Sequence, residues 1–310
     1  MIQKELLNMG YQVIWWNSRA SNSFFFKALL SLLPSFTRKI SELVYFFKLK
    51  KIARKKIDVV FLIKGDGLTR YFLNALKNRF LGARFFLYSW DSIENNKHIL
   101  NICDLFESIK TFDYSDSIKK KWGYRPLFSS LNCRKAKIKQ TKKLYDLCLI
   151  ATNHSDRIEV LREFLNKNRT LASTSYFYLY VNNFLVYFLC FFKSPTFFLS
   201  FFKYSHVKTL PYSLCLKIIS QSRAVLDIEH PKQAGLTMRT IETLILGTKV
   251  ITTNKHIIKS DLYHPTRVCL IDRKNPAISK SFMKSSFKPL ARGIKAKYST
   301  QYWIRDILNV

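Results

Sequence analysis

Residues 227–254 read DIEHPKQAGLTMRTIETLILGTKVITTN, and this stretch decides the fold. Its pattern predicts a polar loop, a helix that opens near Gly235, a helix stop at Gly247 and a short β-branched strand from Lys249 to Thr253. A helix start offers free backbone N–H groups and the positive end of the helix dipole, and Arg239 adds a fixed cation there. The stretch therefore predicts a site for a diphosphate.

Glu242 lies one helical turn beyond this phosphate site. A carboxylate at that distance can accept hydrogen bonds from the vicinal hydroxyls of a ribose, which indicates a nucleotide-sugar site. The plainer interpretation is a surface helix with a capping Thr237 and solvated charges. The residues that we expect to bind the donor are Arg157, Gln233, Gly235, Leu236, Thr237, Arg239, Thr240 and Glu242.

Two sets of segments resemble known glycosyltransferases. Residues 242–254, ETLILGTKVITTN, are similar to the donor-binding helix and following strand of GT-B glycosyltransferases, where a Glu, a Gly five residues on and a Val-Ile strand recur. QAGLTMRTIETL (233–244), WDS (90–92) and FDYSD (112–116) resemble the CgeB-like group of bacterial lipopolysaccharide and capsule biosynthesis transferases. This second resemblance covers most of the chain.

The resemblance implies a GT-B-like α/β fold, in which two Rossmann-like domains face a cleft. It also implies transfer of a sugar from a nucleotide-sugar donor to a lipid-linked or polysaccharide acceptor, in the synthesis of lipopolysaccharide, O-antigen or capsule. One position departs from the pattern, because the large retaining GT-B group carries a second Glu eight residues before the first, where this chain has Ala234. The stereochemical outcome of transfer therefore stays open.

The composition indicates a folded, strongly basic protein. The chain has 310 residues, 48% of them hydrophobic, which is enough for two domains with separate cores. Its net charge of +32 favours polyanionic partners, namely phosphate-bearing substrates, an anionic membrane or nucleic acid. No nucleic-acid-binding motif is visible, so we expect no specific nucleic acid, and a basic nucleic-acid binder is the weakest alternative. Six scattered cysteines indicate reduced thiols in a cytoplasmic protein.

Strands and helices alternate along the chain, which predicts doubly wound α/β domains. We expect strands at 11–16, 57–63, 84–89, 108–112, 145–151, 224–227, 249–253 and 268–271, and helices at 2–9, 23–50 with a break at Pro34, 68–80, 117–122, from about 156, at 214–220 and at 301–308.

The expected domains are an acceptor-side domain over 1–143, a donor-binding domain over 144–296 and a terminal helix over 297–310 that crosses back. The best candidate for a linker is the basic stretch 134–143. The related fold begins with a strand and loop, whereas this chain begins with a helix. We therefore expect that the first strand is missing through truncation or a misplaced start codon, which puts the activity of this form in doubt.

Residues 176–192, YFYLYVNNFLVYFLCFF, contain no charge and are just long enough to suggest a membrane span. Asn182 and Asn183 and the many aromatic residues fit a strand and a partly buried or interfacial helix better. The aromatic run at 197–204, with Lys203 in it and Lys193 nearby, suits attachment to an anionic leaflet, and a domain core explains it equally well. We expect a cytoplasmic protein, peripheral at the inner face of the cell membrane.

Candidate catalytic groups follow two predicted strands of the first domain. Asp91 is the preferred base for an acceptor hydroxyl, with Trp90 beside it for sugar stacking, and Asp66 is the second candidate. Helix capping or turn formation explains either aspartate as well. His154 and His230 are weaker candidates, and Arg157 would either meet a donor phosphate or pair with Glu159 or Glu163 on its own helix.

The chemistry that we expect needs neither a metal nor a cofactor beyond the nucleotide-sugar substrate. The sequence contains no Asp-x-Asp triplet of the metal-dependent GT-A arrangement, and no Walker, dinucleotide-binding or Gly-x-Ser-x-Gly motif. The alternative from another class is a non-catalytic polysaccharide-assembly protein at the membrane surface that keeps the fold without the activity.

Overall fold

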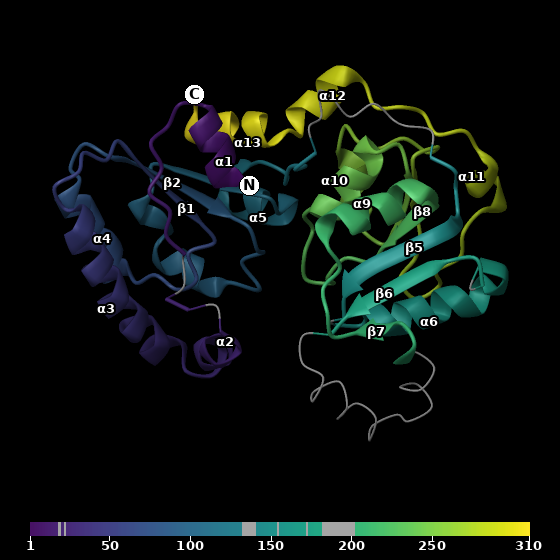
Figure 1. Ribbon diagram of the computed structural model, residues 1–310, viewed down its shortest axis with the longest axis horizontal. Helices are drawn as coiled ribbons and strands as arrows, with labels where there is room; N and C mark the ends of the chain where they lie inside the picture. Colours follow the sequence, from purple (N-terminus) through teal and green to yellow (C-terminus); the bar gives the residue numbers. More distant parts are fainter. Residues whose placement is uncertain (18–19, 22, 132–140, 154, 172, 182–201) are drawn as a thin grey trace. The chain divides into compact units, whose positions relative to one another are not determined.

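The computed structural model describes residues 1–17, 20–21, 23–131, 141–153, 155–171, 173–181 and 202–310 (Figure 1). Its contacts divide the chain into two compact units. Unit 1 comprises Met1–Leu127, Lys232–Gly235 and Thr300–Val310, and unit 2 comprises Phe128–Pro231 and Leu236–Ser299. Residues 134–140 of the expected linker lie outside the described residues. Residues 182–192 of the uncharged run and His154 lie outside them as well.

Unit 1 is built on a parallel sheet with the strand order β1-β2-β3-β4. The strands are β1 (Val59–Ile63), β2 (Arg84–Ser89), β3 (Ser108–Thr111) and β4 (Gly123–Tyr124). Its helices are α1 (Ile2–Asn8), α2 (Phe24–Leu32), α3 (Pro34–Ile52), α4 (Arg70–Arg79), α5 (Tyr114–Lys120) and α13 (Thr300–Leu308), with 3-10 turns η1 (Lys97–Asn101) and η2 (Cys103–Leu105).

Strand β2 is the centre of this unit because both of its faces are covered. Its residues Phe85, Phe86, Leu87 and Tyr88 are all buried, as the continuous apolar run predicts for an inner parallel strand. On one face α3 and α4 contribute Tyr45 and Phe72 to the core. On the other face Trp303 of α13 lies 4.7 Å from the Tyr88 ring, measured between centroids.

Two predictions in unit 1 need correction. Residues 11–16 form no strand, and Trp16 packs its ring near Phe72 of α4 at 6.5 Å instead of pairing with the sheet. Its neighbours Ile14 and Trp15 remain exposed, so this apolar segment is only partly covered. The helix expected at 117–122 begins earlier, at Tyr114, because the Asp113 carboxylate accepts hydrogen bonds from the amides of Ser115 and Asp116 and caps it.

Unit 2 is built on a parallel sheet with the strand order β10-β9-β8-β5-β6-β7. The strands are β5 (Tyr145–Thr152), β6 (Tyr176–Tyr180), β7 (Ser205–His206), β8 (Ser222–Asp227), β9 (Lys249–Thr252) and β10 (Val268–Leu270). The helices and 3-10 turns are α6 (Arg157–Lys167), η3 (Arg169–Leu171), α9 (Tyr212–Gln221), α10 (Met238–Ile245), η4 (Lys255–Lys259), α11 (Lys280–Lys284) and α12 (Arg292–Lys297).

The two faces of strand β5 enter different cores, which makes this sheet doubly wound. Leu147 and Leu149 pack in one core with Phe164 of α6, whereas Cys148 packs in the other with Ile218 of α9. Burial raises the pKa of the Cys148 thiol to about 11, so this cysteine is the core residue that the apolar pattern predicts. The prediction of an α/β fold with two parallel sheets is confirmed.

Part of the uncharged run belongs to this second sheet. Residues 176–180 form β6, paired with β5 on one side and β7 on the other, with Phe177 and Leu179 buried. Across the described residues, none of the helices combines the length and apolar character needed to cross a bilayer. The remainder of the run, from 182 onward, lies outside the described part.

Candidate functional site

The start of helix α10 is fixed by hydroxyl groups. Thr237 is the N-cap residue, and its Oγ1 accepts a hydrogen bond from the Thr240 amide at 3.1 Å. The Thr237 hydroxyl also donates to the Asp227 carboxylate at 3.1 Å, and the Thr240 hydroxyl bonds to the same oxygen. Asp227 is the last residue of β8, so these bonds join the helix start to the carboxyl end of the sheet.

Three donors at this helix start are uncommitted. Among the described residues, the amides of Met238 and Arg239 have no hydrogen-bond acceptor, and the Arg239 guanidinium has neither a hydrogen bond nor an ion pair. The Arg239 side chain is half-buried, which limits its freedom. Two backbone amides and a cation at the positive end of a helix can together bind a phosphate group.

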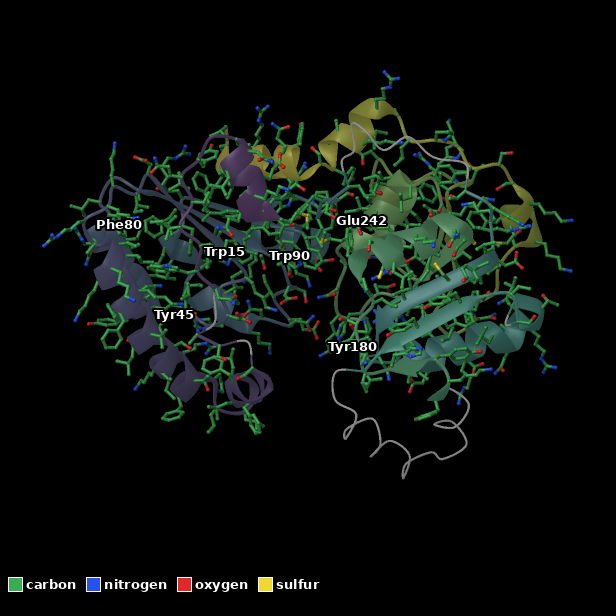
Figure 2. The ribbon with its side chains drawn as sticks, viewed as in Figure 1. Trp15, Tyr45, Phe80, Trp90, Tyr180 and Glu242 are labelled. Carbon is green, nitrogen blue, oxygen red and sulfur yellow. The ribbon has the colours of Figure 1, made fainter. Side chains whose placement is uncertain are left out.

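Glu242, labelled in Figure 2, is buried. Two segments distant in sequence hold its carboxylate. Its Oε1 accepts a 2.5 Å hydrogen bond from the hydroxyl of Tyr212, at the start of α9. The same oxygen accepts from the Ser130 hydroxyl at 3.1 Å and the Ser130 amide at 3.4 Å. No hydrogen bond joins Oε2 to a described residue. One oxygen therefore fixes the carboxylate, and the other can accept a bond from a ligand.

Arg239 and Glu242 both influence the hydroxyl of Tyr212. They are three residues apart on α10, a spacing that puts both side chains on one side of a helix. Partial burial and the hydrogen bond to Glu242 raise the pKa of the Tyr212 hydroxyl, and the positive charge of Arg239 opposes this rise. Both charges therefore reach the same phenol, and the predicted pair lies on a common face.

Arg157 is used within the fold. Its Nε donates to the Ile228 carbonyl at 2.9 Å, its Nη2 to the same oxygen at 2.6 Å, and its Nη1 to the Thr152 carbonyl. Burial lowers its pKa, and the negative charge of Asp227 partly offsets that effect. These bonds tie the end of β5 to the loop after β8, so Arg157 supports the edge of the sheet on which α10 begins.

A second arginine at this edge was missed by sequence reasoning. Arg273, after β10, donates to both carboxylate oxygens of Asp156 at 2.7 and 2.8 Å and to Glu229 Oε1 at 2.9 Å. The Thr253 hydroxyl bonds to the other Glu229 oxygen. Burial lowers the pKa of Arg273, but its bonds to Glu229 and Asp156 outweigh this and hold the pKa above its usual value. Asp156 is the N-cap residue of α6, and its carboxylate bonds to Arg273 and makes no capping hydrogen bond.

The loop before α10 packs on the segment FDYSD within unit 1. The Asp113 carboxylate accepts a 2.7 Å hydrogen bond from the amide of Ala234. A Cβ placed on Gly235 would lie 2.2 Å from a ring carbon of Phe112, so only glycine fits there. Gly235 thus has a packing reason as well as a predicted binding role, and two segments singled out by resemblance are in direct contact.

The other predicted residues of this stretch differ in exposure. Leu236 and Thr240 are buried, and Gln233 is half-buried. Leu236 lacks a polar side chain, and the Thr240 hydroxyl is occupied by Asp227. Neither of these two side chains is suited to a ligand, and the Thr240 amide already donates to Thr237 Oγ1.

In unit 1, the two candidate bases converge on a lysine. Lys64 pairs with the carboxylate of Asp91 and lies 3.9 Å from that of Asp66, measured between Nζ and Oδ2. Lys64 has a φ of 72°, a left-handed conformation that costs a non-glycine residue roughly 1 kcal/mol. The Asn96 side chain donates to its carbonyl at 2.9 Å and holds the turn. Lys64 lies in the loop that follows the predicted strand, and sequence reasoning assigned it no role.

Trp90 belongs to an aromatic cluster. Its ring packs edge to face against Tyr88 at 6.0 Å and Trp303 at 6.1 Å, measured between centroids. It is half-buried, so part of the indole is accessible for the predicted sugar contact. His230 lies half-buried in the loop after β8.

Comparisons with protein-family models and with curated protein sequences give no match. Solved structures are similar to the chain. The lipopolysaccharide outer core galactosyltransferase WaaB, in its apo form, has a TM-score of 0.52 at 11% identity, over 89% of this chain and 81% of that one. The UDP-GlcNAc 2-epimerase of Methanocaldococcus jannaschii, in complex with UDP-GlcNAc and UDP, has a TM-score of 0.52 at 10% identity, over 98% and 87%.

A third structure, TarM, has a TM-score of 0.51 at 12% identity, over 85% of this chain and 56% of that one. Likeness at such low identity shows the fold alone. The fold is that of the GT-B proteins, as the resemblance of residues 242–254 implied, and the more specific resemblance to the CgeB-like group stays a prediction.

Proposed function

We propose that this protein is a glycosyltransferase that uses a nucleotide-sugar donor. The observation that carries the proposal is the arrangement on helix α10, where a fixed carboxylate follows an uncommitted cation by one turn. Arg239 and the amides of Met238 and Arg239 suit the donor diphosphate, and the free oxygen of Glu242 suits a ribose hydroxyl.

Each group has a role in the proposed reaction. Arg239 and the helix start neutralise the charge that develops on the departing diphosphate, so that no metal is needed for that step. Glu242 orients the donor through the ribose. Asp91 accepts the proton of the acceptor hydroxyl if transfer inverts, and Lys64 positions its carboxylate. Asp66, beside the same lysine, is the second candidate.

The structural neighbours support the donor class and leave the reaction type to other observations. One is a galactosyltransferase and another is an epimerase in complex with UDP-GlcNAc and UDP, so the same fold serves both reactions. Transfer is our choice because residues 233–254 and the segments WDS and FDYSD resemble glycosyltransferases. On the same resemblance, we propose a hexosyl or related donor, a lipid-linked or polysaccharide acceptor, a role in lipopolysaccharide, O-antigen or capsule synthesis, and a place at the inner face of the cell membrane.

A thermal-shift screen of the full chain against UDP, GDP, CMP and dTDP and their sugars tests the donor site. We expect at least one nucleoside diphosphate to raise the melting temperature, since a ligand that binds only the folded form stabilises it. Arg239→Ala should abolish the shift, and Glu242→Gln should reduce it. Arg162→Ala, which removes an exposed arginine of α6 in the same unit, is the matched control and should leave the shift intact. Melting unchanged by every nucleotide would reject the proposal.

Product analysis separates the remaining possibilities. With the stabilising donor, release of the nucleoside diphosphate together with a glycosylated acceptor supports transfer, and release that survives a chelator supports independence from metals. Conversion of the donor to its epimer without release would instead indicate an epimerase. Binding without either reaction would favour the non-catalytic alternative.

A further inference from the structure

Helix α3 has its polar and apolar sides reversed. The face that enters the core of unit 1 carries Thr37, Ser41, Tyr45 and Leu49, all buried. The two hydroxyls there need no partner from the core, because Thr37 Oγ1 donates to the Leu33 carbonyl at 2.8 Å and Ser41 Oγ to the Thr37 carbonyl at 2.9 Å. Small polar residues thus occupy half of the inner face.

The outer face of α3 is apolar. Five side chains spaced three and four residues apart lie on one side of the helix and point away from the core, and these are Phe36, Ile40, Leu43, Val44 and Phe47. Leu43 is 64% exposed and Phe47 66%. Helix α2, which packs against α3 (Figure 1), adds Phe25 at 84% and Leu32 at 78%. We call these seven residues the α2–α3 apolar face. Large apolar side chains that gather on one side of a helix and stay exposed mark an interaction site.

The α2–α3 apolar face is bordered by positive charge. Between residues 34 and 56 the chain has one acidic residue, Glu42, and eight basic ones, Arg38, Lys39, Lys48, Lys50, Lys51, Arg54, Lys55 and Lys56. Glu42 is engaged by the Thr69 hydroxyl. Lys39, Lys50 and Lys51 are exposed and form no ion pair with any described residue, and the Lys50 ammonium lies 5.9 Å from the Phe47 ring centroid.

We propose that the α2–α3 apolar face docks on an anionic phospholipid bilayer. Helix α3 would lie in the plane of the interface, with its Phe, Leu, Val and Ile side chains among the acyl chains and its lysines at the lipid headgroups. This inference stands on unit 1 alone and does not depend on the nucleotide site of unit 2.

Charge argues for lipid over the other occupants. A second copy of this chain would bring the same lysines and the same net charge of +32 to the contact, and like charges repel. A nucleic acid would match the lysines but not the exposed Phe and Leu side chains. An anionic bilayer surface matches both, because its headgroups are negative and its interior is apolar.

Co-sedimentation of the full chain with vesicles tests the proposal. Vesicles of phosphatidylglycerol mixed with phosphatidylcholine should bind the protein, and vesicles of phosphatidylcholine alone should bind it far more weakly. The triple variant Phe36→Ser, Leu43→Ser and Phe47→Ser should lower the apparent affinity on the order of a hundredfold, because three large side chains no longer leave water. Lys50→Gln with Lys51→Gln should lower it about tenfold.

The matched control replaces three apolar residues of similar exposure elsewhere, Leu144→Ser, Ile118→Ser and Ile258→Ser, and should bind as the natural chain does. Tryptophan fluorescence verifies that unit 1 folds in every variant, since all five tryptophans, Trp15, Trp16, Trp90, Trp122 and Trp303, belong to unit 1. The thermal shift with nucleotide verifies unit 2, in which Leu144 and Ile258 lie. The thermal shift with nucleotide should be unchanged in every variant, so failure here is distinguishable from failure of the donor site.

Three results would overturn the proposal. The first is that the natural chain does not sediment with the anionic vesicles. The second is that the serine triple variant binds them as well as the control does, which would reduce the effect to the attraction of a basic protein for negative charge. The third is that the natural chain dimerises in sedimentation velocity, loses the dimer in the serine variant and binds no vesicles, which would assign the face to a second copy.

Discussion

Helices α3 and α10 both bury polar side chains, and they do so in opposite ways. On α10 the buried Glu242 and Thr240 bond to groups of other segments, namely Tyr212, Ser130 and Asp227. On α3 the buried hydroxyls bond to carbonyls of the same chain segment, four residues back. The polar groups of α10 are therefore held in place by the fold, whereas those of α3 only fill space.

The difference indicates which side of each helix has a function. A buried carboxylate is costly unless it is bonded, so the bonds around Glu242 indicate a charge that the fold retains on the inside. On α3 the costly feature is outside, where large apolar side chains meet solvent. We infer a ligand on the inner side of α10 and a partner on the outer side of α3.

The largest expected effect tests which face of α3 enters the core of unit 1, the one with Tyr45 or the one with Phe47. Tyr45, on its inner face, is 1% exposed and packs 5.3 Å from the Phe72 ring, measured between centroids. Tyr45→Ala should destabilise unit 1 by about 3–5 kcal/mol, because it leaves a cavity in the core. Phe47→Ala, two residues on and exposed, should change stability by less than about 0.5 kcal/mol. Urea denaturation followed by tryptophan fluorescence reports unit 1, and equal losses would show that Phe47 is a core residue.

The next effect concerns Glu242. Glu242→Ala should destabilise the region around α10 by about 1–3 kcal/mol, because the Tyr212 and Ser130 donors lose their acceptor. Glu242→Gln keeps an accepting oxygen and should lose much less. Hydrogen exchange of the α10 amides is the measurement. If the two variants exchange alike, the carboxylate is not held as we describe.

The sequence correctly predicted those helices and strands whose first and last residues are determined by their neighbours in the chain. The limits of β2 agree with the expected 84–89, because an apolar, aromatic run is bounded by a turn on one side and a polar loop on the other. Thr237 at the start of α10 and Gly247 after its end, with a φ of 78°, are local signals in the same sense. The strand predicted at 11–16 was wrong because a short apolar segment can pack one ring, that of Trp16, near a helix without pairing with a strand.

The site was predicted only in part, because its bonds join distant segments. Tyr212 is 30 residues from Glu242 and Ser130 is 112 residues from it, so no spacing in the sequence joins them. Arg273 and Lys64 were missed for the same reason, since their carboxylate partners are assigned by the way strands align. The α2–α3 apolar face was hidden as well, because an apolar helix by itself does not show which side enters the core.

A smaller effect is expected from the phenol that holds Glu242. Tyr212→Phe removes one hydrogen bond to a carboxylate and should cost about 1 kcal/mol or slightly more at neutral pH. The folded-state pKa of Tyr212 lies above its usual value, so its stabilising contribution is present below about pH 10 and is lost as the pH rises beyond it, where the unfolded chain ionises first. The variant should therefore show a shallower loss of stability in alkali by calorimetry. A steeper loss would contradict this placement of Tyr212.

The smallest effect is expected from the hydroxyls of α3, and a hydroxyl of α10 is the reference for them. Thr37→Val and Ser41→Ala on α3 remove hydroxyls that bond only to the helix itself, so each should change the stability of unit 1 by no more than about 0.5 kcal/mol. Thr240→Val on α10 removes a donor from the buried Asp227 carboxylate, and we expect a loss of about 1.5–3 kcal/mol in unit 2. Urea denaturation with tryptophan fluorescence measures the α3 variants, and hydrogen exchange measures Thr240→Val. If Thr37→Val costs as much as Thr240→Val, the inner face of α3 depends on its hydroxyls. The apolar outer face would then no longer be the feature that sets this helix apart.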